Sequence, residues 1–191
     1  ATNFAGFAVS GEVSYRPDFP VQINTTELLQ GAVGEAPWST VLPRIIAAGP
    51  GAAASGFDRL PVTQAQVTFI RFFDPVLGAS RLSFAAEVGG NWVGDLPEQS
   101  VQRYGRSPTY GMGYFEPIPL PIPGQFITCE EGNALIGVAP PNSNASNCTT
   151  DGYVTDSSWG YRMRAGLTYN DVFAGINLTP GLAWSHDVSG Y

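Results

Sequence analysis

The sequence predicts an all-β fold, an antiparallel transmembrane β-barrel of which this chain is a part, about five strands of a larger barrel, with long external loops. Three observations lead to this prediction. Apolar and polar residues alternate with period two over five segments. Short connections alternate with long ones along the chain. Aromatic side chains gather at the ends of the apolar faces, as they do in outer-membrane barrels.

The composition excludes several other classes of protein. Only 13% of the 191 residues are charged, and 23 Gly and 16 Pro are present, which disfavours a helical bundle. The formal net charge is −7, with no cluster of basic residues, so no nucleic-acid partner is expected. No apolar run approaches the roughly 18–20 residues that a membrane-spanning helix needs.

The alternation defines five predicted strands, over residues 5–15, 63–73, 80–92, 158–169 and 172–185. The clearest segment places Met163, Ala165 and Leu167 on one face and Arg162 and Arg164 on the other. The second segment carries one exception, because Arg71 falls on its apolar side. At a lipid-facing position near a strand end, such an arginine is expected to extend its head group towards water.

The connections between these strands differ strongly in length. The Asn170-Asp171 pair is interpreted as a two-residue hairpin, and Asp74 to Gly78 as a tight turn. Residues 16–61 and 93–157 are long loops. Outer-membrane barrels have this asymmetry of short periplasmic turns and long external loops. Five strands are too few to close such a barrel, so residues 1–191 are assigned to part of one larger barrel domain.

Aromatic residues on the apolar face are predicted to form two girdles. From Trp159 to Tyr169 the chain spans about 33 Å as a strand, and a tilt near 40° reduces this to about 25 Å, the height of the apolar band in such barrels. The predicted girdle residues are Tyr15, Trp92, Trp159, Tyr161 and Trp184 next to the long loops, and Phe73 and Tyr169 next to the short turns.

The opposite face is predicted to line the lumen. Placing Trp92 opposite Trp159 sets Glu87 opposite Arg164, where a cross-strand ion pair is expected, and the Asn170-Asp171 hairpin sets Gly166 opposite Gly175. The alternative is the solvated face of a soluble sheet. The lumen-facing candidates are Glu12, Gln64, Gln66, Arg81, Glu87, Arg162 and Arg164.

The long loops contain three local signals. Cys129 and Cys148 are predicted to form a disulfide, with two unpaired thiols as the alternative. Asn24 followed by Glu27 has the spacing of a capping box, which favours a short helix. Arg103 and Arg106 are a weak signal for anion binding.

Pro recurs at every second position over residues 117–123, which favours an extended or polyproline conformation. Signals for chemistry are few. His186 is the sole histidine, and its neighbours Ser185 and Asp187 cannot join it in a catalytic triad because adjacent strand residues face opposite ways. We therefore expect no catalytic residue, no metal site, no cofactor and no enzyme activity.

Several strings in the sequence resemble the C-terminal half of a proteobacterial outer-membrane β-barrel family, catalogued as domain of unknown function 1302. They are VSGEVSYRP at 9–17, VQIN at 21–24, RFFD at 71–74, LGASRL at 77–82, RYGRSP at 103–108 and AWSHDV at 183–188. The resemblance spans nearly the whole chain and implies a barrel in the outer membrane of Gram-negative bacteria. The N-terminal half of the family and its final strands are expected to lie outside this sequence.

The resemblance also implies a class of function. Family members are often encoded beside periplasmic and inner-membrane export components, which suggests passage of hydrophobic molecules or lipids. The expected function is thus a porin-like or lipid-conducting barrel, with outer-membrane lipid and those export components as partners. The alternatives are a secreted soluble β-domain that binds glycans through exposed aromatics, and a barrel-embedded hydrolase, against which the lone His counts.

Overall fold

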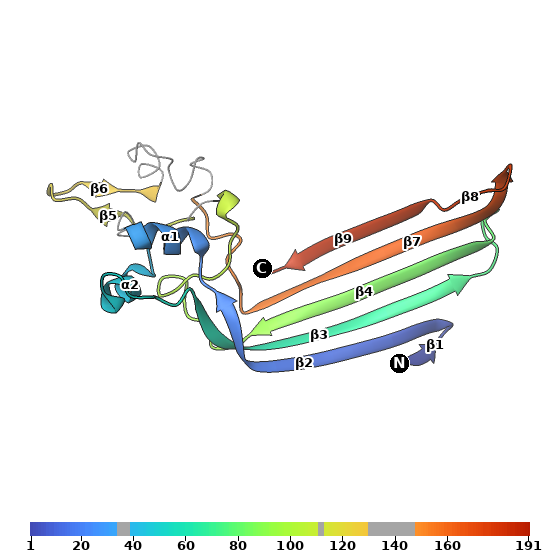
Figure 1. Ribbon diagram of the computed structural model, residues 1–191, viewed down its shortest axis with the longest axis horizontal. Coiled ribbons are helices and arrows are strands. Elements are labelled where there is room, and N and C mark those ends of the chain that lie inside the picture. The colour runs from blue at the N-terminus through green and yellow to red at the C-terminus, as the bar shows by residue number, and fades with distance from the viewer. Residues whose placement is uncertain (34–38, 111–112, 130–147) are drawn as a thin grey trace. The chain divides into compact units, whose positions relative to one another are not determined.

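The computed structural model describes residues 1–33, 39–110, 113–129 and 148–191. The chain divides into two compact units, and its elements are labelled in Figure 1. We call Ala1–Pro17, Pro61–Gly94 and Thr155–Gly190 the sheet unit. We call Asp18–Leu60, Asp95–Val154 and Tyr191 the loop unit.

The strands pair into a seven-stranded sheet in the order β1-β2-β3-β4-β7-β8, with β9 also pairing with β7. The prediction of an antiparallel, sheet-rich fold is confirmed, since β1 pairs with β2, β3 with β4, β4 with β7, and β7 with both β8 and β9, all in the antiparallel sense. The strands are β1 (Thr2–Phe4), β2 (Phe7–Gln22), β3 (Phe57–Phe73), β4 (Arg81–Val93), β7 (Ser157–Phe173), β8 (Ile176–Leu178) and β9 (Gly181–Ser189).

Most of these strands extend beyond their predicted bounds. The prediction that the first strand begins at residue 5 is wrong, because Ala5 and Gly6 have φ of 49° and 80° and form the turn between β1 and β2. The fifth predicted strand is divided into β8 and β9 around Thr179 and Pro180. Proline lacks the N–H that a sheet ladder requires, which accounts for an interruption here.

The register assigns the side chains to two faces, because directly opposite residues of antiparallel strands lie on the same side. Phe69, Ala86, Met163 and Trp184 form one row across four strands, on what we call the apolar face. The adjacent row, on what we call the polar face, consists of Thr68, Glu87, Arg162 and Ser185. These face assignments agree with the alternation in the sequence.

Three predicted cross-strand pairings are wrong by register. Trp92 lies opposite Ser157, and Glu87 lies opposite Arg162 instead of Arg164. Gly166 lies opposite Gly181 instead of Gly175. The first two pairings differ from the prediction by two residues and the third by six. A shift by any even number of residues keeps every side chain on its own face, so alternation alone could not distinguish these registers.

The predicted hairpin at Asn170-Asp171 is also wrong. Strand β7 continues to Phe173, and the turn is made by Ala174 and Gly175, with φ of 49° and 81°. Two successive residues with positive φ are typical of a type I′ hairpin, for which a glycine is favoured. The β3–β4 turn is similar, with Leu77 and Gly78 in the left-handed region between the bridged residues Val76 and Ala79.

In the described part of the loop unit lie the helices α1 (Thr25–Val33) and α2 (Leu42–Ala48) and the 3-10 turn η1 (Pro108–Tyr110). Helix α1 begins where the capping box predicts, because the Glu27 N–H donates to Asn24 Oδ1 at 2.9 Å. Within the described residues, neither helix is long and apolar enough to cross a membrane.

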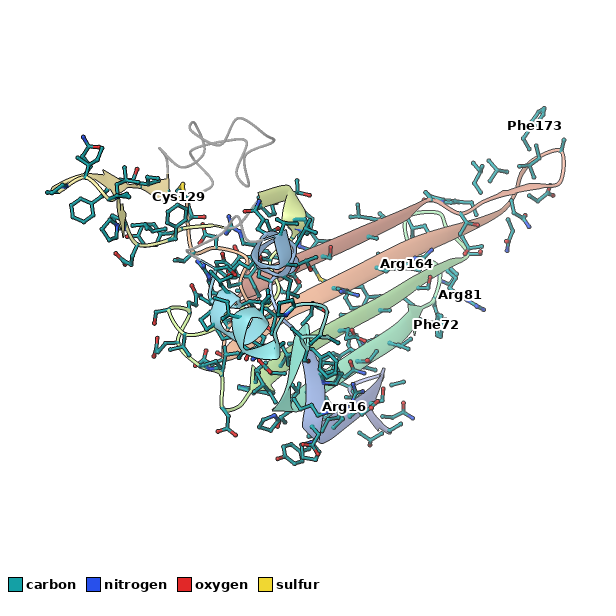
Figure 2. All side chains as sticks on the ribbon, turned by 60° about the vertical axis from the view of Figure 1, so that its left-hand side comes forward. Arg16, Phe72, Arg81, Cys129, Arg164 and Phe173 are labelled. Atoms are coloured by element: carbon teal, nitrogen blue, oxygen red, sulfur yellow. A yellow bond between two sulfur atoms is a disulfide. The ribbon has the colours of Figure 1, made fainter. Side chains whose placement is uncertain are left out.

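The proline-rich stretch 117–123 is extended only in its first part, and its residues 121–123 form bends and a turn. Its residues Ile118–Pro119 form β5, which pairs with β6 (Phe126–Ile127) in a small two-stranded sheet. The predicted disulfide is confirmed, with the sulfur atoms of Cys129 and Cys148 2.06 Å apart. Figure 2 labels Cys129 beside the yellow sulfur atoms.

Candidate functional site

The centre of the polar face brings Glu87 of β4 directly opposite Arg162 of β7. The Thr68 hydroxyl on β3 donates a hydrogen bond of 3.4 Å to Glu87 Oε2. Among the described residues, the ion pairs within 4.0 Å do not include Glu87, Arg162 or Arg164. The expected cross-strand ion pair is therefore not formed, and both guanidinium groups are presented on the face.

Three of the other predicted lumen candidates lie on the same face by register. Gln64 and Gln66 are opposite Asn91 and Gly89. Arg81, near the turn end of β4, is opposite Thr168, and its guanidinium lies 5.7 Å from the centre of the Phe72 ring. Glu12 belongs to β2 and is exposed.

Two hollows in the sheet unit meet at Arg164. The first, of about 390 Å³, is lined by Thr68, Glu87, Arg162 and Ser185 among others. The second, of about 280 Å³, is lined by Ile70, Phe72, Gly166 and Gly181 among others. Arg164 lines both hollows, and both are largely apolar, but the charged side chains Glu87 and Arg162 line only the first.

The apolar face carries the predicted girdle residues. Trp92 and Trp159 lie near the end of β4 at Val93, and the side chain of each is 48% exposed. The Tyr161 ring packs edge-on against His186, with ring centres 5.6 Å apart. At the turn end, Phe73 pairs with Leu82, and the Tyr169 hydroxyl donates to the Leu77 carbonyl at 3.3 Å.

Trp184 and Tyr15 differ from the other predicted girdle residues. Trp184 lies opposite Met163, four positions along β7 from Trp159, and is therefore further from the strand end than the sequence suggested. Tyr15 on β2 is 65% exposed.

Arg71 lies on the apolar face, where the alternation placed it. Its guanidinium is 4.5 Å from the Phe73 ring centre and 5.1 Å from that of Phe7, and Nη1 donates to the Ala5 carbonyl at 3.0 Å. Cation–π contacts and a backbone acceptor satisfy a charge that would otherwise be costly among apolar side chains.

The loop unit contains a buried ion pair that the sequence did not predict. Glu27 Oε1 and Arg103 Nε are 2.5 Å apart, and their side chains are 0% and 6% exposed. The other carboxylate oxygen, Oε2, accepts 2.8 Å hydrogen bonds from both the N–H and the hydroxyl of Thr40. Glu27 thus joins helix α1 to two segments that are distant in the sequence.

Arg103 and Arg106 do not form the anion site that their spacing suggested. Arg103 pairs with Glu27, and Arg106 donates to the carbonyls of Asp151 and, at 2.9 Å, Tyr110. Both guanidinium groups also lie within 6 Å of the Tyr153 ring centre, at 5.6 and 5.2 Å. Burial raises the pKa of the Tyr153 phenol.

A second polar cluster connects helix α2 with the start of β3. Asp58 Oδ2 accepts hydrogen bonds of 2.9 Å from both Arg44 and the Tyr104 hydroxyl. Burial alone would raise the pKa of Asp58, but these two donors outweigh it and lower that pKa. Burial, with the hydrogen bond to Asp58, raises the pKa of Tyr104 to about 12.

The sequence model of the family described as "Protein of unknown function (DUF1302)" matches residues 1–191. The chain belongs to the DUF1302 family. No curated protein and no solved structure matches it.

In this DUF1302 chain, the described residues contain no group of three or more His, Cys, Asp or Glu side chains that could hold a metal ion. His186 packs against Tyr161 on the apolar face, while Asp187 lies opposite Gly160 on the polar face.

Sequence reasoning missed two features of the DUF1302 chain. The first is the burial of Glu27. The sequence showed only its capping spacing, and an acidic side chain three residues after an N-cap gives no sign of burial. Ile70 and Phe72 break the alternation of β3 on its polar side, and these two residues in the sequence could have indicated an apolar patch on that face.

Proposed function

We propose that the sheet unit is part of a transmembrane β-barrel in the outer membrane of Gram-negative bacteria, with its apolar face towards lipid and its polar face towards the lumen. The barrel is porin-like or conducts hydrophobic molecules or lipids. The observation that carries the proposal is the continuous apolar face of long antiparallel strands, on which Trp159, Met163 and Trp184 stay 48%, 39% and 56% exposed. A single apolar sheet face needs cover by protein or by lipid.

Three further observations support the proposal. The charged side chains of the central strands lie on the opposite face, as barrel strands require. Every residue of β9 is exposed, which leaves a strand edge to which further strands of a barrel could pair. The disulfide in the loop unit suits an oxidising compartment such as the periplasm or the cell surface.

Adjacent residues in the middle of β3 provide the test. Val67 lies on the apolar face opposite Val88, and Gln66 lies on the polar face opposite Gly89. In the proposed barrel, Val67→Arg places a charge in the hydrocarbon layer and is expected to disfavour insertion by about 2–4 kcal/mol. Gln66→Arg is the matched control and is expected to insert as the wild type does.

The measurement is the fraction of each variant that floats with phospholipid vesicles and resists extraction by carbonate. Equal insertion of the two arginine variants would contradict the proposed orientation. A wild-type chain that stays monomeric and folded without detergent or lipid would favour the secreted glycan-binding domain instead.

A further inference from the structure

The polar face changes its chemistry from one row of side chains to the next. Successive rows run across β3, β4, β7 and β9 at right angles to the strands, and each is fixed by register. The first row is polar, the second contains one arginine between alanines, and the third has Phe72, two glycines and Ser83, whose hydroxyl donates to the Gly166 carbonyl. The rows are Thr68, Glu87, Arg162 and Ser185; then Ile70, Ala85, Arg164 and Ala183; then Phe72, Ser83, Gly166 and Gly181.

Arg164 stands at the boundary between these regions. Its neighbours in the row, Ala85 and Ala183, carry no side-chain acceptor. Among the described residues, the ion pairs include neither Arg164 nor Arg162, which lies two positions away on the same face. Glu87 lies opposite Arg162 but forms no ion pair with it, so the two neighbouring guanidinium groups leave at least one positive charge for an anion that accepts paired hydrogen bonds, such as a carboxylate.

On the turn side of Arg164, the polar face has room for an apolar group. The hollow of about 280 Å³ is lined by Ile70 and Phe72, which are 39% and 64% exposed, and by Gly166 and Gly181, which have no side chains. In Figure 2, Phe72 and Arg81 are labelled towards the turn end of the strands and Arg164 on β7. The apolar surface therefore begins beside the guanidinium group.

We propose that this part of the polar face binds an amphipathic carboxylate, with the head group on Arg164 and Arg162 and the hydrocarbon chain in the hollow between Phe72 and Gly181. The inference rests on the proposed function in one respect: the proposed barrel makes the polar face the lumen side. It names the class of molecule that a conducting barrel would accept. An unbranched fatty acid anion has the required combination of one charged end and an apolar chain.

Binding of decanoate tests this proposal, because it has the head group and a chain but stays soluble as a monomer. Equilibrium dialysis would compare decanoate binding by the wild type and the variants in lipid nanodiscs of the same composition. The decanoate that partitions into lipid is then the same in each sample and does not affect the difference between them. The wild type is expected to bind decanoate more tightly than acetate, which has no chain, and than decyltrimethylammonium, which has the opposite charge. Arg164→Gln is expected to weaken decanoate binding by about tenfold.

Two glycine substitutions test the hollow without removing a charge. A Cβ at Gly181 would meet the Ala165 carbonyl oxygen at 3.6 Å, an ordinary contact, so Gly181→Val is tolerated by the sheet and fills the hollow. Gly89→Val is the matched control, because a Cβ there meets its nearest atoms at 3.7 Å on the same face, outside the hollow. Only Gly181→Val is expected to weaken decanoate binding.

Acetate binding as tight as that of decanoate would overturn the proposal and leave a site for small anions only. Unchanged decanoate binding by both Arg164→Gln and Gly181→Val would overturn it as well. The insertion assay with Val67→Arg is independent of these results. If the wild type needs no lipid, the same dialysis in buffer tests the site after the barrel proposal has failed.

Discussion

The burial and pairing of charged side chains differ between the two units of the chain. In the loop unit, Glu27 and Arg103 are buried and paired, whereas on the sheet Arg162 and Arg164 are exposed and form no ion pair among the described residues. A buried charge without its partner is strongly unfavourable, so the loop-unit pair is a structural requirement. An exposed guanidinium remains available to a ligand or an ion.

Glu27→Gln should therefore destabilise the loop unit. The substitution leaves the Arg103 guanidinium buried without its carboxylate, which typically costs about 3–5 kcal/mol. Pulse proteolysis in urea, with the cleavage sites located by mass spectrometry, would measure the change in the loop unit. The control is Glu12→Gln at an exposed position, for which a change within about 0.5 kcal/mol is expected. Equal stability of the two variants would show that the Glu27–Arg103 pair contributes nothing.

Tyr104 should make the stability of the loop unit depend on alkaline pH. Its pKa is raised to about 12 in the folded chain, against about 10 in an unfolded chain. The neutral phenol is thus the form that folding favours, so its contribution is complete below about pH 10 and is lost as the pH rises through about 12. Pulse proteolysis across this range should show the loss.

Two Tyr→Phe variants, one as the test and one as the control, assign this loss of stability to Tyr104. Tyr104→Phe removes the titrating group and should flatten this part of the profile, at the expense of the hydrogen bond to Asp58. Tyr110→Phe, at a side chain that is 55% exposed, should leave it unchanged. An identical alkaline profile for the wild type and Tyr104→Phe would assign the loss to other groups.

Among the elements, the faces of the strands could be predicted from the sequence, but the registers could not. Period-two alternation assigned Met163 and Arg162 to opposite faces correctly. Successive side chains of a strand always point to opposite faces, whatever the register of the pairing. It could not choose between registers that differ by two residues, which is why Glu87 was matched to Arg164. Helix α1 had a capping signal at Asn24, whereas α2 begins at Leu42 after Val41, which provides no side-chain cap.

The candidate site could be predicted only in part for the same reason. Arg162 and Arg164 were identified as a pair on one face, but the hollow beside Arg164 depends on Gly166 lying opposite Gly181. That pairing depends on the hairpin at Ala174-Gly175, which the Asn170-Asp171 dipeptide obscured, and on the register shift between Tyr169 and Phe173. The wrong turn and this shift together displaced every predicted pairing between β7 and β9.

Gly175→Ala should destabilise this hairpin because Gly175 has φ of +81°, where a side chain is strained. A cost of about 1–2 kcal/mol is expected from the left-handed conformation. Gly166→Ala is the control, since its Cβ would meet Ser83 Oγ at 3.4 Å without a strained φ. Amide hydrogen exchange of β8 and the end of β7 would measure the difference, and equal exchange in the two variants would contradict the assigned turn.

For the whole molecule, the proposed barrel implies that the charges of the polar face act on whatever passes through the lumen. Arg81, Arg162 and Arg164 lie on β4 and β7, on the same face as Glu87. Side chains in the lumen of a barrel tune its selectivity. Glu87 lies opposite Arg162 only, so the two arginines leave one net positive charge at these neighbouring positions.

Replacing both Arg162 and Arg164 by Gln should shift the selectivity of the barrel away from anions. The reason is electrostatic: two positive charges on adjacent positions of one face raise the local anion concentration, and glutamine keeps much of their size without the charge. The measurement is the reversal potential in a planar bilayer with a salt gradient. Gln64→Ala and Gln66→Ala remove uncharged side chains from the same face of β3 and serve as the control. A conducting wild type whose reversal potential is unchanged by the double arginine substitution would show that these charges do not face the permeation path.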